Sequence, residues 1–123
     1  MTSPATLAAG LRAHAQGLCC SEAAAELLIA QPWLHRADFT SRFVTVYRNP
    51  GGGQPAAVID WPAVVTALGT SLPCSGGEQR MLKITASLAD GIPVDLRDTI
   101  TGIDDRNIQS LLTAIRRASG KSS

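Results

Sequence analysis

The sequence contains few of the residues that most often carry chemistry, with only two histidines and three cysteines among its 123 residues. Neither a Cys-x₂-Cys nor a His-x₃-His spacing occurs, so the common zinc motifs are excluded. No G-x-S-x-G elbow or P-loop is present either. We therefore expect no metal, no cofactor and no conventional catalytic set.

Long hydrophobic runs and aromatic residues are also scarce. The longest apolar runs are much shorter than the roughly 18 residues that a membrane span requires, so we expect no membrane-spanning segment. The start, Met1-Thr2-Ser3-Pro4, lacks the basic and apolar regions of a secretory signal. An odd number of cysteines then indicates a reducing compartment without disulfides. These features predict a cytoplasmic protein whose cysteines serve as small buried hydrophobic residues.

Neither sign of charge dominates. The chain has eleven basic and ten acidic residues, which gives a net charge of +1. The two halves of the chain have a similar balance of charge. Proteins that bind nucleic acid or anionic lipid usually concentrate basic residues on one face. The composition therefore does not favour nucleic acid or a membrane as the partner.

What the sequence does have is enough apolar residues for one core. Hydrophobic residues make up 45% of the chain and charged residues 17%, which argues against disorder. The length fits a single domain over residues 1–123, and we expect residues 119–123 to form a frayed tail.

Helical spacing and capping residues predict most of the elements. We expect helices that begin near Pro4, Ser21, Pro62, Glu78 and Asp105, the last with an apolar stripe of Ile108, Leu111, Leu112 and Ile115. Residues 42–48 and 56–61 are predicted to pair as an antiparallel hairpin across a glycine-rich loop. Residues 92–96 are a candidate third strand. The predicted class is α+β: a β-hairpin, or a three-stranded sheet, packed against four to five helices.

The segment before the helix at Glu78 is the strongest candidate site. Cys74 and Arg80 have the C-x₅-R spacing of cysteine phosphatases, in which backbone amides at a helix N-terminus and an arginine hold an anion. The candidate anion-binding residues are Cys74, Ser75, Gly76, Gly77 and Arg80. The alternative interpretation is structural, because Ser-Gly-Gly-Glu is also a good helix start.

The same segment resembles known families. Ser75–Arg80 resembles the signature motif of ABC-type ATPases, and Val94–Asp104 is similar in spacing to their Walker B and D-loop run, although no Walker A motif exists. That resemblance implies a remnant phosphate site at Ser75, Gly76 and Gly77. Most of the chain resembles a group of small actinobacterial proteins, through Asp38-Phe39, Ile59-Asp60-Trp61, Ser75–Glu78, Val94–Leu96 and Thr101–Asp105. The latter resemblance implies no activity.

All five aromatic side chains fall within residues 33–61 and form the second candidate site. They are Trp33, Phe39, Phe43, Tyr47 and Trp61. With Arg36, Arg42 and Arg48 between them, they could form a stacking platform for single-stranded nucleic acid. The favoured interpretation is that they form the core of the hairpin against the helices, and a further one is an exposed apolar patch that binds a protein.

Three functions follow from these observations. The leading hypothesis is a non-catalytic interaction or regulatory module that acts through a protein partner, with a homodimer as one form. The first alternative is an anion- or nucleotide-binding protein built on residues 74–80. The second is a nucleic-acid accessory protein, which would require its basic residues to gather on one surface.

Overall fold

Helices dominate the structure, a computed structural model that describes residues 2–48 and 50–121. This part of the chain forms an α+β fold, as predicted, in which one antiparallel hairpin packs against seven α-helices. The elements are α1 (Pro4–Ala15), α2 (Cys19–Ile29), the 3₁₀ helix η1 (Pro32–His35), α3 (Ala37–Phe43), β1 (Val44–Tyr47), β2 (Ala56–Ile59), α4 (Trp61–Ala67), α5 (Gly76–Asp90), α6 (Leu96–Ile100) and α7 (Asp105–Ala118).

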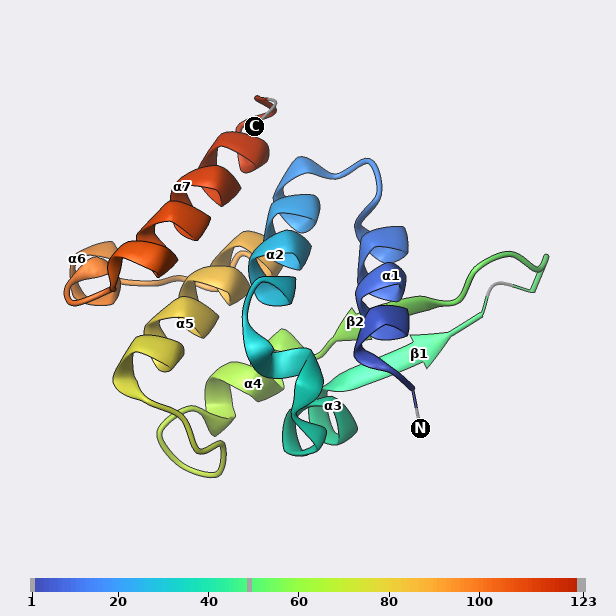
Figure 1. Ribbon diagram of the computed structural model, residues 1–123, viewed down its shortest axis with the longest axis horizontal. Coiled ribbons are helices and arrows are strands. Elements are labelled where there is room, and N and C mark those ends of the chain that lie inside the picture. Colours follow the sequence, from blue (N-terminus) through green and yellow to red (C-terminus); the bar gives the residue numbers. More distant parts are fainter. Residues whose placement is uncertain (1, 49, 122–123) are drawn as a thin grey trace.

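Helix α2 lies at the centre of the arrangement. It contacts α1 on one side and both α5 and α7 on the other, while α1 packs across strand β2 (Figure 1). The main hydrophobic core lies between α1, α2, the hairpin, α4 and α5, and a smaller one lies between α2, α5 and α7. The α7 helix therefore joins the fold through the smaller core alone.

Helix α1 approaches β2 unusually closely, because both surfaces carry small residues. A Cβ atom at Gly10 would lie 3.0 Å from both the Cβ atom and the backbone nitrogen of Ala57. Ser3 caps this helix as predicted, its hydroxyl accepting a hydrogen bond from the Thr6 amide at 3.2 Å. The glycine thus sets the distance between the helix and the hairpin.

The hairpin is shorter than predicted, because its flanks are helical. Residues 42 and 43 do not belong to the strand but end α3, a helix that the sequence analysis missed. Phe39 and Phe43 stand four residues apart on this helix, where both are buried and their rings pack together. Trp61 likewise begins α4 instead of ending β2, and the Asp60 side chain caps that helix as predicted.

Two further predictions about elements are wrong. Residues 92–96 do not form a third strand: residues 91–95 are irregular, and α6 begins at Leu96 with Asp95 as its cap. Pro93 in this segment has no N–H to donate to a sheet. The second helix begins at Cys19 and not at Ser21, and Cys19 and Cys20 are exposed instead of buried.

Helices α5 and α7 begin directly after residues whose side chains can cap a helix. The side chains of Ser75 and Asp104 cap α5 and α7 respectively. At the end of α7, Gly120 has a φ of +86° and the Lys121 amide donates to the Arg116 carbonyl at 3.0 Å. The predicted frayed tail extends to Ser122 and Ser123, which lie outside the described residues. Among the described helices, none is both long and apolar enough to cross a membrane.

Candidate functional site

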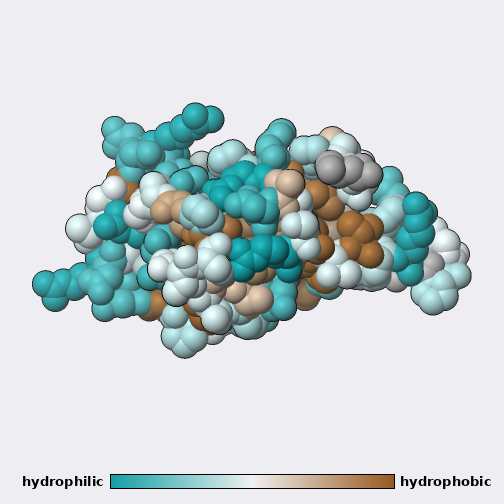
Figure 2. All heavy atoms as spheres, turned by 90° about the horizontal axis from the view of Figure 1, so that it is seen from below, coloured by the Kyte–Doolittle hydropathy of each residue, from teal (hydrophilic) through white to brown (hydrophobic). Residues whose placement is uncertain are grey.

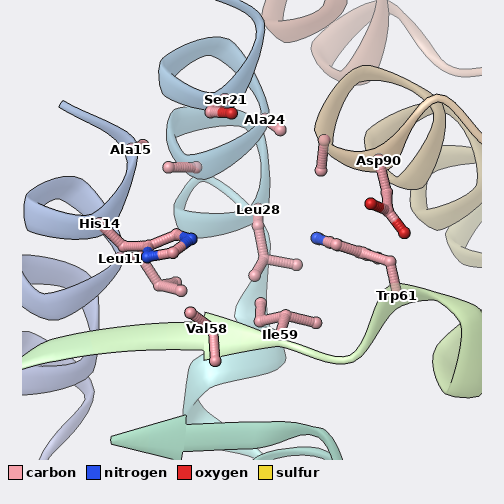
Figure 3. Close-up of a pocket in the computed structure, with 12 residues that line it drawn as sticks. Leu11, His14, Ala15, Ser21, Ala24, Leu28, Val58, Ile59, Trp61 and Asp90 are labelled. Carbon is pink, nitrogen blue, oxygen red and sulfur yellow. The ribbon is translucent and has the colours of Figure 1, made fainter. Parts of the chain in front are cut away.

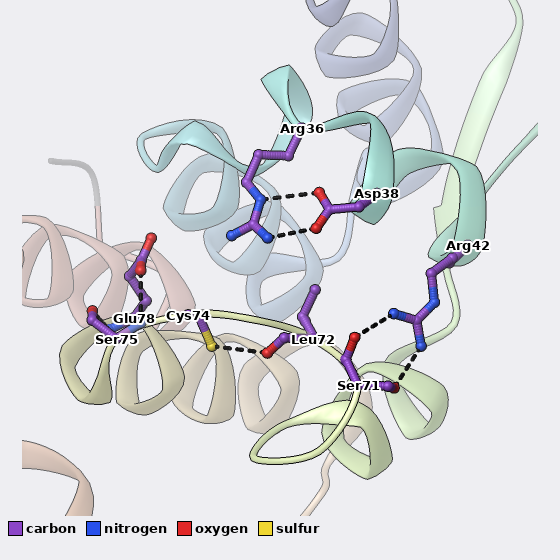
Figure 4. A network of polar contacts seen from close by, with 8 residues as sticks. All are labelled: Arg36, Asp38, Arg42, Ser71, Leu72, Cys74, Ser75 and Glu78. Atoms are coloured by element: carbon purple, nitrogen blue, oxygen red, sulfur yellow. Dashed lines mark hydrogen bonds and ion pairs between the residues drawn. The ribbon is translucent and has the colours of Figure 1, made fainter.

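The predicted anion loop is closed by its own side chains. The Ser75 amide donates to a carboxylate oxygen of Glu78 at 2.9 Å, and the Glu78 amide donates to the Ser75 hydroxyl at 3.2 Å (Figure 4). This reciprocal pair is a capping box. Two of the amides that an anion would need are therefore engaged, and a carboxylate occupies the place of the anion.

The Cys74 thiol does not have the character of a nucleophile. Its sulfur donates a weak hydrogen bond to the Leu72 carbonyl, 3.6 Å away, and the side chain is half-buried. Burial raises the pKa of the Cys74 thiol, and the nearby Glu78 carboxylate raises it further, against a smaller opposing effect of Arg36. The thiolate is thus disfavoured, whereas a phosphatase-like cysteine requires a stabilised one.

Arg80 lies against the loop between α6 and α7. One guanidinium nitrogen, Nη1, is 3.3 Å from the position that a Cβ atom at Gly102 would take, and 3.9 Å from the equivalent position at Gly76. Among the described residues, Arg80 forms no hydrogen bond with Cys74, whose sulfur instead bonds the Leu72 carbonyl. The structure therefore brings Ser75, Gly76 and Gly77 together at the start of α5, but this geometry does not favour an anion clamp.

The segment that resembles Walker B and the D-loop is not one continuous element. Val94 and Asp95 are irregular, Leu96–Ile100 form α6, and Asp104 caps α7. Asp95 and Asp104 each use their carboxylate to cap the helix that follows. The carboxylates in this segment thus have a structural role, and the family resemblance stays a prediction.

The aromatic residues of the second candidate site belong mostly to the core. Trp33, Phe39, Phe43 and Trp61 are buried, whereas Tyr47 is 38% exposed. The ring centroids of Trp33 and Phe39 are 5.2 Å apart, and those of Phe39 and Phe43 are 5.3 Å apart. Four of the five residues therefore follow the core interpretation, and as a set they do not form an exposed interface.

The surface around these aromatics is mixed. Helices α3 and α4 lie at the lower edge of Figure 1, and therefore on the side that Figure 2 shows. Hydrophobic residues there form small areas that hydrophilic side chains interrupt (Figure 2). This face has no broad apolar patch in the view shown.

Two of the three interleaved arginines, Arg36 and Arg42, bind neighbouring residues. Arg36 forms a two-bond ion pair with Asp38, at 3.0 and 2.6 Å, and stacks over Trp33 at 4.7 Å. Arg42 donates to the carbonyl and the hydroxyl of Ser71, at 3.0 and 2.8 Å (Figure 4). These guanidinium groups fasten neighbouring segments to one another, so they give little support to a shared phosphate-binding surface.

The unpartnered apolar surface lies instead on α7. Of its predicted stripe, Leu111 is buried and Ile108 is half-buried, but Leu112 and Ile115 are each 51% exposed. The helix packs on α2 and α5 through Leu111 and the small residue Ala114. Residues 108, 112 and 115 follow the spacing i, i+4, i+7 and therefore form one face, turned away from the smaller core. We call Ile108, Leu112 and Ile115 the α7 face.

Sequence reasoning found these residues as the apolar stripe of a helix but did not say which of them would stay exposed. Periodicity shows that a helix has an apolar side, yet it does not say which element covers that side. The available signal was a second, weaker line of small residues, at Ser110, Ala114 and Ala118, about a quarter-turn or more from the stripe. Helices pack most closely through small side chains, and α7 uses that line.

Charged residues mark the two ends of α7. Asp104 and Asp105 stand at its start, followed by one basic residue, Arg106, and its end carries Arg116, Arg117 and Lys121. Negative charges at the N-terminus and positive charges at the C-terminus both interact favourably with the helix dipole. The α7 face thus runs between an acidic end and a basic end.

Comparison with family models, with curated proteins and with solved structures finds no match to this chain. The α7 face and the cavities of this structure are therefore interpreted from their own geometry.

Proposed function

We propose that this protein is an interaction module that pairs with a second copy of itself through the α7 face. The observation that carries the proposal is the exposure of Leu112 and Ile115 on a regular helix that packs into the smaller core through a neighbouring side, at Leu111 and Ala114. Half-exposed leucine and isoleucine side chains gain on the order of 1 kcal/mol each when their burial is completed. A partner that covers this face therefore gains binding energy without a change in the fold.

The charge at the ends of α7 favours a second copy as that partner. When two such helices pair antiparallel, the acidic start of each lies opposite the basic end of the other. A parallel pairing would bring like charges together. An antiparallel pairing is also what a two-fold axis across the helix produces, and two-fold dimers are the commonest oligomers.

The overall charge does not oppose such pairing. Two copies that each carry a net charge of +1 repel one another only weakly. The α7 face extends over eight residues, from Ile108 to Ile115, or about 10 Å of helix, which is a short seam. Leu96 and Ile100 of α6 and Leu18 before α2 are further exposed apolar residues that could enlarge the contact.

The test is the molar mass of the purified protein in solution, measured by light scattering on a size-exclusion column. We expect the mass of a dimer for the natural sequence and that of a monomer for Leu112→Asp, which places a charge in the seam. Val46→Asp is the matched control: Val46 is 42% exposed on the hairpin, far from α7 along the chain, and this variant should remain dimeric.

A natural sequence that is monomeric at every concentration tested would contradict the proposal. So would a dimer that Leu112→Asp leaves intact while circular dichroism shows the variant folded. In that case the dimer would use another surface.

A further inference from the structure

A buried polar group without a partner lies near the C-terminal end of α7. Among the described residues, the Nε–H of Arg117 is the one buried side-chain nitrogen or oxygen that has no hydrogen-bond partner. By contrast, His14, which projects into the pocket between α1, α2 and β2, is exposed and bonds the Tyr47 hydroxyl at 2.8 Å (Figure 3). An unpaired buried donor is unfavourable, and more so when it belongs to a charged group, so the Arg117 Nε–H calls for an explanation.

The carboxylate nearest to this guanidinium is already occupied. Glu26 of α2 accepts two hydrogen bonds from Arg12, at 2.7 and 3.0 Å, so each of its oxygens has a guanidinium partner. The charge of Arg117 also contributes to the low pKa of Glu26, which places the two groups near one another. Two arginines and one glutamate together carry a net charge of +1. One further negative charge would balance this group.

Arg117 lines a pocket between α2 and α7, two helices that lie side by side (Figure 1). The pocket is half-open and has a volume of about 160 Å³. A cavity of about 150 Å³ is sufficient to hold the six carbon atoms of benzene. More of the lining is apolar than polar, and its apolar residues are Leu27 and Ala30 of α2 and Ala114 of α7. The pocket therefore combines a small hydrophobic space with an unpaired cationic donor.

From this geometry we infer that the pocket binds a short aliphatic monocarboxylate, with the carboxylate on Arg117 and the hydrocarbon chain against the apolar wall. The Nε–H and one Nη–H of a guanidinium form a fork that matches the two oxygens of a carboxylate. Arg117 as a whole is only half-buried, and its long side chain can turn this fork toward the pocket. A monocarboxylate balances the local charge of +1, whereas a phosphate dianion would reverse it. Few polar groups in a mainly apolar pocket are typical of small-molecule sites.

The test uses butyrate as the probe, because its six non-hydrogen atoms match the volume of the pocket. The readout is the set of arginine Nε–H signals in a ¹H–¹⁵N NMR spectrum, with the Arg117 signal assigned from Arg117→Lys. Butyrate at tens of millimolar should move the Arg117 signal and leave in place that of Arg36, which is paired with Asp38.

Two analogues of butyrate separate the charge of the ligand from its chain. Butyramide has the same shape without the charge, and it should bind about tenfold more weakly because it loses the charge-assisted hydrogen bonds. Acetate keeps the charge but lacks two methylene groups, and it should also bind about tenfold more weakly because it buries less apolar surface.

Four variants test the residues of the pocket, with the backbone amide signal of Ala114 as the readout. Arg117→Met removes the unpaired donor, so the protein should stay folded and lose butyrate binding. Arg116→Met is the matched control, because it removes the same charge from the neighbouring, exposed residue, and it should bind butyrate within about twofold of the natural sequence. Ala30→Leu should fill the pocket and weaken binding. Glu26→Gln should strengthen binding, since it removes a negative charge beside Arg117, whereas partial unfolding would weaken it.

The inference is overturned if butyrate does not move the Arg117 signal, or if an equal concentration of sodium chloride moves that signal as far. It is also overturned if butyramide binds as tightly as butyrate, or if a folded Arg117→Met protein binds butyrate as well as the natural sequence does. The pocket residues 110, 113 and 117 lie on the opposite side of the helix from the α7 face. Leu112→Asp should therefore bind butyrate normally, so this result is independent of the dimer.

Discussion

At the scale of single residues, the clearest electrostatic contact joins the first two helices. Arg12 of α1 donates two hydrogen bonds to the Glu26 carboxylate of α2, at 2.7 and 3.0 Å. The hydrogen bond from Arg12 holds the pKa of Glu26 below its ordinary value, and the charges of Arg12 and Arg117 act in the same direction, against partial burial. The ionised carboxylate is therefore more stable in the folded protein than in the unfolded chain.

This pKa shift predicts a loss of stability in acid. Because the folded pKa of Glu26 is depressed, its contribution is present above the ordinary pKa of about 4.3 and disappears as the pH falls through the folded value. Glu26→Gln should lower the free energy of unfolding at pH 7 and make it fall less steeply below about pH 5. Urea denaturation at a series of pH values measures both effects. If the free energy of unfolding of Glu26→Gln fell with pH as steeply as that of the natural sequence, the assigned role of Glu26 would be wrong.

Single residues also explain why the predicted anion loop is an ordinary helix start. Glu78 is the third residue of α5 and reaches back to the Ser75 amide. A carboxylate at that position stabilises the helix, and it is also what a phosphate would have to displace. Glu78 is part of the Ser-Gly-Gly-Glu pattern that resembles a phosphate-binding motif. Its capping interaction explains the same pattern as the start of a helix.

At the scale of elements, the packing of α1 on β2 depends on one missing side chain. Gly10→Ala would raise the helix propensity of α1 by up to about 1 kcal/mol. It would also place a methyl group 3.0 Å from the backbone nitrogen and the Cβ atom of Ala57, so the helix or the strand must move. Overpacking of this kind typically costs about 1–3 kcal/mol, so we expect a net loss of stability.

Thermal unfolding of Gly10→Ala measures this balance. Ala9→Leu is the matched control, since it adds a larger side chain at the neighbouring, exposed position of the same helix. The control should change the free energy of unfolding by no more than about 0.5 kcal/mol. A Gly10→Ala protein that melts above the natural sequence would show that the helix and hairpin have room to separate.

At the scale of the whole molecule, the proposed pairing links stability to protein concentration. If unfolding converts a dimer into two free chains, each tenfold increase in concentration should raise the Tm by about 2–3 °C for a dimer of this size. Leu112→Asp should abolish this dependence. Differential scanning calorimetry over two decades of concentration is the measurement, and a constant Tm for the natural sequence would argue against the dimer.

The sequence by itself determined the fold class, the hairpin and the starts of most helices. These features depend on local chemistry: capping side chains at Ser3, Asp60, Ser75 and Asp104, and β-branched residues before a glycine-rich loop. Each of these interactions is completed within a few residues along the chain. Helix α3 was missed because Phe39 and Phe43 gain their stability by packing with distant residues of the core.

Only the tertiary structure decided which surfaces remain open. The apolar stripe of α7 is plain in the sequence, but the choice to bury Ala114 and leave Leu112 exposed depends on how closely α2 and α5 approach. The pocket lined by Leu11, Leu28 and Trp61 likewise exists only because residues of α1, α2, β2, α4 and α5 meet there. Both properties are relations between segments far apart in the chain, and local patterns of residues carry no information about such distances.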